Sequence, residues 1–190
     1  MRDPREEKWN SITHAIGVGI FFPTLFSASP TTRFLSLVLL STYILSVLYH
    51  ASEAESVRST MRMLDIASIH ASIYGTSVVY AALLGAPYAV CFSLVILGMA
   101  SIRYVVVKYD SWYFERCLVP TCMLSGSICL VTILCLPIEG SQDILSYFLA
   151  GLLAYVFGLI FYVNDERRWY HTIWHVFVLL GSLIHVIGTT

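Results

Sequence analysis

Two histidines near the carboxyl end of the chain have the spacing of a metal-binding pair. His171 and His175 are four residues apart in an apolar run, so on an α-helix they share one face, one turn apart. One helix can then offer two imidazole nitrogens to the same metal ion. Because an ionisable side chain is expensive in hydrocarbon, this pair favours a functional site inside a helix bundle. The alternative is two histidines that reach the membrane surface from a helix end.

Three more polar residues are expected at the same depth. His50 ends the second apolar run, Ser46 precedes it by one helical turn, and Asp65 lies near the start of the third run. Three histidines and one open position form a catalytic zinc arrangement, and a nearby carboxylate can hold the activated water or take its proton. We predict that Zn²⁺ binds to His50, His171 and His175. Asp65 is then the general base, and Ser46 orients a ligand, the water or a substrate carbonyl. The alternative is a structural Asp–His pair without metal.

The other three histidines are given different roles. His14 lies on a polar face of the first run, where it could face the substrate or hold a metal ligand in place, but helix packing is the favoured interpretation. His70 is about 140° around the helix from Asp65 and is expected to point away from the site. His185 lies roughly 15 Å along the helix from His175, too far to bind the same ion. We expect it to line the far end of a polar cavity or to be interfacial.

The composition places these residues in a membrane. Of the 190 residues, 57% are apolar and only 12% are charged, and the mean hydropathy is +0.75. These values are typical of a polytopic membrane protein and give no reason to expect a nucleic-acid partner. A spanning helix needs ~20 apolar residues. The chain has seven such runs, which predict one all-α domain over residues 1–190, a bundle of seven transmembrane helices at about 9–28, 32–51, 62–82, 86–107, 115–136, 143–163 and 168–188.

The basic residues predict the orientation of this bundle. Loops rich in Lys and Arg are retained in the cytoplasm. Of the 11 basic residues, all but Arg33 fall on the side of the amino terminus. We therefore expect a cytoplasmic amino terminus and an outside carboxyl terminus. The predicted zinc site then lies in the cytoplasmic half.

Several motifs of the chain resemble those of the haemolysin III family, in the wider group that includes the progestin and adiponectin receptors and the alkaline ceramidases. They are Glu6-Glu7-x2-Asn10-x2-Thr13-His14-x2-Gly17, Ser46-x3-His50, Leu64-Asp65 and His171-x2-Trp174-His175-x2-Val178-x2-Gly181-Ser182-x2-His185. The resemblance implies a seven-helix bundle with an intramembrane zinc, held by the same three histidines with Asp65 and Ser46 near the metal-bound water. It also implies hydrolysis of lipid amides and a bacterial inner membrane.

The chain departs from the family pattern on its third helix. Asp65 is followed by Ile66, where the family often has His, and the segment after Gly75 lacks the proline of a Gly-Thr-Tyr-Thr-Pro-like motif. The third helix is therefore expected to be straighter than in the family.

Three hypotheses for function follow. The first is a zinc-dependent intramembrane hydrolase, in which a metal-activated water attacks a ceramide-like lipid amide and Asp65 moves the proton. The second is a membrane receptor or sensor, with a fatty-acid or other lipid ligand and a structural zinc whose fourth position Asp65 fills. The third is an ion or proton pathway or a haemolysin-like pore. Short loops and the lack of an amphipathic pore-forming segment argue against a pore.

Overall fold

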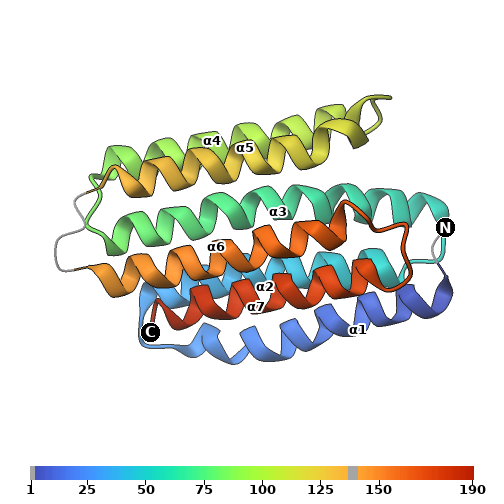
Figure 1. The fold of residues 1–190 in the computed structure, drawn as a ribbon, viewed down its shortest axis with the longest axis horizontal. Coiled ribbons are helices and arrows are strands. Elements are labelled where there is room, and N and C mark those ends of the chain that lie inside the picture. Colours follow the sequence, from blue (N-terminus) through green and yellow to red (C-terminus); the bar gives the residue numbers. More distant parts are fainter. Residues whose placement is uncertain (1–2, 137–140) are drawn as a thin grey trace.

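The fold is a bundle of α-helices that run along one long axis (Figure 1). The computed structural model describes residues 3–136 and 141–190. Within these residues the chain is all-α with seven α-helices, as the sequence predicted, and it has one short 3₁₀ helix in addition. They are α1 (Pro4–Phe21), η1 (Pro23–Phe26), α2 (Pro30–Ala51), α3 (Glu55–Leu83), α4 (Tyr88–Lys108), α5 (Phe114–Leu134), α6 (Gln142–Tyr162) and α7 (Tyr170–Ile187).

Among the described residues, the six helices from α2 to α7 are long and apolar enough to cross a membrane. The chain is therefore a multi-pass integral membrane protein. The helix α1 is not one of the six, because it begins with four charged residues, Arg5 to Lys8. Its buried face is also largely polar: Glu7, Asn10, His14, Gly17 and Phe21. These residues recur every three or four positions, so α1 turns its polar side toward the bundle.

Two helix starts differ from the predicted spans. The helix α1 begins at Pro4 rather than near residue 9, because the Asp3 side chain caps it by accepting the Arg5 backbone N–H at 2.8 Å. It ends before Pro23, where the chain continues as η1. The helix α3 begins at Glu55, seven residues before the predicted start at residue 62. Hydropathy alone marks the apolar part of a helix and misses polar turns that extend it.

The helix α3 is the central element of the bundle and contacts α2, α4, α5 and α6. The helices α4 and α5 both lie on one side of α3 in Figure 1, and each contacts α3. They expose large apolar side chains such as Phe92, Leu97 and Leu124. On the other side, α7 packs against α6, α1 and α2. This second group positions the polar residues singled out in the sequence.

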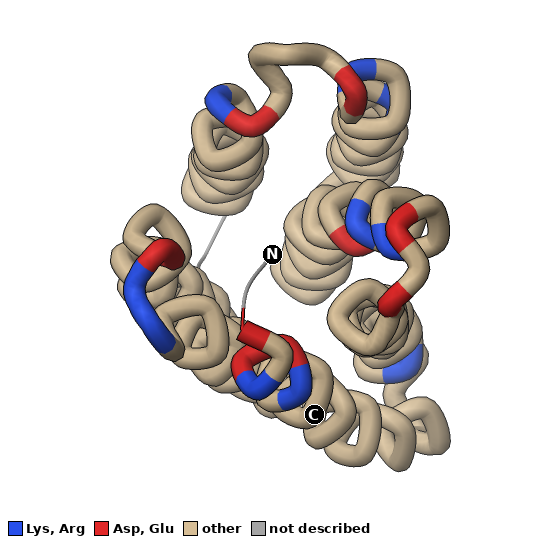
Figure 2. Tube along the Cα trace, turned by 90° about the vertical axis from the view of Figure 1, so that its right-hand side faces the viewer, with Lys and Arg blue, Asp and Glu red and all other residues tan. Residues whose placement is uncertain are grey.

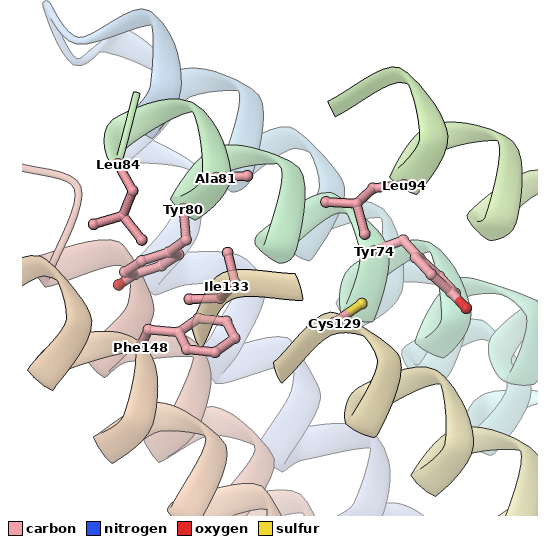
Figure 3. Close-up of a cluster of buried hydrophobic side chains, with 8 residues drawn as sticks. All are labelled: Tyr74, Tyr80, Ala81, Leu84, Leu94, Cys129, Ile133 and Phe148. Carbon is pink, nitrogen blue, oxygen red and sulfur yellow. The ribbon is translucent and has the colours of Figure 1, made fainter. Parts of the chain in front are cut away.

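An apolar core closes the bundle at the carboxyl-terminal end of α3. Figure 3 shows its buried members, which come from α3, α4, α5 and α6 and from the turn after α3: Tyr74, Tyr80, Ala81, Leu84, Leu94, Cys129, Ile133 and Phe148. Charged residues gather at the opposite end of the bundle, which faces the viewer in Figure 2. There Arg62 of α3 forms an ion pair with Glu115 of α5 at 2.6 Å. The two ends of the bundle therefore differ sharply in polarity.

Candidate metal centre

Three histidines meet near the charged end of the bundle. His50 comes from the last turn of α2, and His171 and His175 come from the first two turns of α7. One nitrogen from each ring lies within 4.8 Å of the other two. His50 and His175 are buried, and His171 is partly buried. The structure thus brings together the three histidines that the sequence analysis proposed as ligands.

The donor set fits a metal ion. Zinc–imidazole bonds are ~2.0–2.1 Å long, so three nitrogens around a tetrahedral ion lie about 3.3 Å apart. Three imidazoles are a ligand set that suits zinc and several other divalent transition metals. The buried triad can therefore bind a metal ion.

Two of the three rings have their Nδ1 atom hydrogen-bonded to an acceptor, and the third has a carboxylate within ion-pair distance. The Nδ1 of His50 is 2.6 Å from Glu7 Oε2, and that of His171 is 3.4 Å from Asp165 Oδ2. The Nδ1 of His175 lies 3.3 Å from the Asn10 carbonyl oxygen, which can only accept a hydrogen bond. Acceptors at Nδ1 favour the tautomer that carries its proton there and keeps the lone pair on Nε2. This is how outer residues orient histidine ligands in metal sites.

The carboxylate beside His50 is itself held by Arg58. The Arg58 Nη2 donates to Glu7 Oε1 at 2.8 Å, and its Nη1 donates to the Ser52 carbonyl at 3.2 Å. The guanidinium also lies over the Tyr49 ring, 4.8 Å from its centroid. A buried carboxylate needs such a partner because an isolated charge is costly away from water. The sequence analysis had not connected Glu7 or Arg58 with His50.

The start of α7 is fixed by the amino-terminal helix. Trp169, the residue before α7, has a φ of 68°, a left-handed conformation that is uncommon outside glycine. Its backbone N–H donates to Glu6 Oε1 at 2.8 Å. On the next turn, the Thr172 hydroxyl donates to Asn10 Oδ1 at 2.6 Å. These contacts tie α1 to the segment that carries His171.

A cleft of about 590 Å³ opens at the charged end next to this cluster. Its lining includes Glu7 and Asp165, which contact two of the three histidines. Basic side chains of Arg58, Arg62 and Arg168 share the lining with further carboxylates. The cluster therefore lies close to a polar, charged opening rather than deep in the apolar core.

Asp65 of α3 and Ser46 of α2 are neighbours in the bundle. The Ser46 side chain lies within reach of the Asp65 carboxyl and links α2 to α3. Ser46 is buried and lies one turn before His50 on the same helix. Asp65 is outside the group of three that could hold the ion. A catalytic role for either residue remains a prediction.

The structure changes the interpretation of two of the other histidines. The His14 ring packs directly on the cluster, with its centroid 3.9 Å from that of His175, instead of only joining helices. His185 is buried and its Nε2 is 3.1 Å from the Phe148 carbonyl oxygen, so its ring faces α6. His70 lies away from the cluster and faces α5, with its Nε2 atom 3.7 Å from Cys122 Sγ. Glu7, Asn10 and His14 recur on one face of α1, and this pattern in the sequence could have indicated that α1 contacts the histidine cluster.

Comparison with known proteins gives a consistent result. The family described as haemolysin-III related matches residues 3–186. The chain is 27% identical to the hemolysin-3 homolog of Bacillus subtilis (strain 168), over 94% of this chain and 90% of that protein. It is 29% identical to hemolysin-3 of Bacillus cereus, over 94% of this chain and 87% of that protein.

Proposed function

The chain belongs to the haemolysin III family, and on that premise we propose that it is a zinc-dependent intramembrane hydrolase of a lipid amide. The family lies within the superfamily of progestin and adiponectin receptors and ceramidase-like proteins. The observation that carries the proposal is the convergence of His50, His171 and His175 into one group, with acceptors hydrogen-bonded to the Nδ1 atoms of His50 and His175. Three imidazoles whose nitrogens converge in one place are a ligand set that suits a zinc ion.

Zinc held by these three histidines supplies a Lewis acid that polarises a carbonyl group and makes water more acidic. Glu7 and Asp165 keep two of the rings in the orientation that ligation needs. Three neutral imidazoles leave the positive charge of the ion available to the substrate.

The Asp65 carboxylate takes the proton of the attacking water as the new C–O bond forms. It then gives this proton to the amide nitrogen as the C–N bond breaks, so that an acid and an amine are released. Ser46, whose side chain lies within reach of Asp65, orients this carboxylate during both transfers. A ceramide-like lipid, with its acyl chain in the membrane, fits this chemistry and location.

The site lies on the cytoplasmic side of a bacterial inner membrane in this proposal. The described basic residues near the cluster include Arg58, Arg62 and Arg168, and such residues are retained inside the cell. The two termini lie at opposite ends of the bundle (Figure 1), as seven crossings require. In this proposal α1 also crosses the membrane and brings the number of crossings to seven. Its polar face is covered by α2 and α7.

Asp65→Asn separates this function from a structural zinc in a receptor. We expect the variant to keep its zinc, measured by elemental mass spectrometry, and to cleave a fluorescent ceramide-type amide about 100-fold to 10,000-fold more slowly. Asp143→Asn, at an exposed position at the start of α6, is the matched control and should match the wild type.

Two results would contradict the proposal. Loss of zinc from Asp65→Asn would make Asp65 a ligand of a closed structural site, as in a receptor. Cleavage by Asp65→Asn at the wild-type rate would remove Asp65 from the proton transfer.

A further inference from the structure

Three buried polar atoms on the inner face of α1 have no hydrogen-bond partner among the described residues. They are both ring nitrogens of His14 and the Nδ2 atom of Asn10. Asn10 is 0% exposed and His14 is 4% exposed, so bulk water does not reach them. Buried polar groups are almost always hydrogen-bonded, and one without a partner indicates a missing water, ion or ligand.

His14 differs in this respect from the other histidines outside the triad. Both ring nitrogens of His70 have contacts, to Cys122 and to Ser125. One nitrogen of His185 is paired with the Phe148 carbonyl. Neither ring nitrogen of His14 has a hydrogen-bond partner among the described residues, although its ring contacts that of His175. The unpaired atoms therefore lie beside the candidate metal centre.

The Asn10 side chain is oriented toward the same region. Its Oδ1 accepts the hydroxyl hydrogen of Thr172, which lies between the two histidines of α7. This bond fixes the orientation of the amide, so the NH₂ group is the part that remains available to a ligand. Asn10 and His14 are one helical turn apart and share a face of α1.

We propose that Asn10 and His14 form a binding site for a small polar oxygen group beside the three histidines. The amide NH₂ has donors, and a neutral imidazole has one donor and one acceptor. This combination suits a carbonyl or carboxylate oxygen, the groups found in an amide substrate and its acid product. The inference rests on the metal centre proposed above and adds the residues that hold the ligand.

Azide binding to the cobalt-loaded protein tests this site. Cobalt(II) in place of zinc gives a visible spectrum, and azide is a small anion that accepts hydrogen bonds. We expect His14→Phe to keep the cobalt content of the wild type but to bind azide at least about tenfold more weakly, because a donor to an anion is lost. His70→Phe, which changes a buried histidine that faces α5, is the matched control and should leave azide binding unchanged.

A second variant keeps the test decisive if His14→Phe does not fold. Asn10→Asp retains the acceptor for Thr172 but replaces the donor by an acceptor, so azide should bind more weakly than to the wild type. Wild-type azide affinity in cobalt-loaded variants would overturn the ligand site alone. Loss of cobalt from His14→Phe would also overturn it, because His14 would then belong to the metal ligands. Failure of the wild type to bind cobalt would overturn both the ligand site and the metal centre.

Discussion

The helix α7 carries two buried polar regions, and they are built differently. In its first two turns, His171 and His175 meet His50 next to a charged cleft. In its last turns, Ser182 and His185 lie among aromatic side chains. The Ser182 hydroxyl is 2.9 Å from the Tyr43 hydroxyl and 2.9 Å from the Tyr155 hydroxyl.

Close packing closes the second region. Gly151 of α6 lies directly against the His185 ring, and Gly181 of α7 lies against Tyr155 and the Gly151 carbonyl. In the first region the rings instead have acceptors on one edge, and the neighbouring His14 has unpaired nitrogens. His185 Nδ1 in the second region also has no hydrogen-bond partner among the described residues. The regions therefore differ in that three imidazoles converge beside a cleft in the first, whereas helices pack closely in the second.

His175→Ala should have the largest effect, and it tests whether the first region holds metal. We expect zinc to fall from about one ion per chain to near zero, since two imidazoles are too few for a stable zinc site. Elemental mass spectrometry on detergent-purified protein measures this. His185→Ala removes a buried histidine from the second region and should retain the zinc of the wild type. Equal zinc loss in both variants would contradict the claim that only the first region binds the metal.

Gly151→Ala tests whether the second region is structural. A Cβ atom at this position would overlap the His185 ring, so the free energy of unfolding should fall by about 2–3 kcal/mol. Thermal unfolding followed by tryptophan fluorescence measures the change, and zinc content should stay at the wild-type level. Gly126→Ala on α5 is the control, because a Cβ there has no neighbour within 4 Å. A destabilisation of the same size in Gly126→Ala would contradict the packing argument.

Glu7→Gln should have the smallest of the three effects and refines the description of the first region. The amide still accepts from His50 Nδ1 but lacks the negative charge, so zinc affinity should fall about tenfold to 100-fold. Competition with a chromophoric chelator measures this affinity. Glu53→Gln, at an exposed position in the loop after α2, should not change it. An unchanged affinity in Glu7→Gln would mean that the carboxylate holds α1 in place without tuning the metal site.

The sequence by itself determined the helical fold and the ligand candidates. Apolar runs of membrane length predicted seven helices, because backbone groups in hydrocarbon must pair within each segment. The spacing of His171 and His175 predicted that they share a face, because local helix geometry fixes positions four residues apart. His50 was added by its expected depth. All three conclusions depend either on the residues of a single segment or on their depth along the membrane normal.

Only the tertiary structure decided which residues surround these histidines. Glu7 is 43 residues from His50 in the chain and pairs with it at 2.6 Å, and Asp165 approaches His171 from the loop before α7. Nothing in the local sequence specifies such pairs, because they depend on how α1, α2 and α7 rotate and pack against one another. The packing of these helices also places His14 against His175. The packing of α7 on α6 places the His185 ring against Gly151. The roles of similar histidines are therefore set by packing between helices, not by residue type or depth.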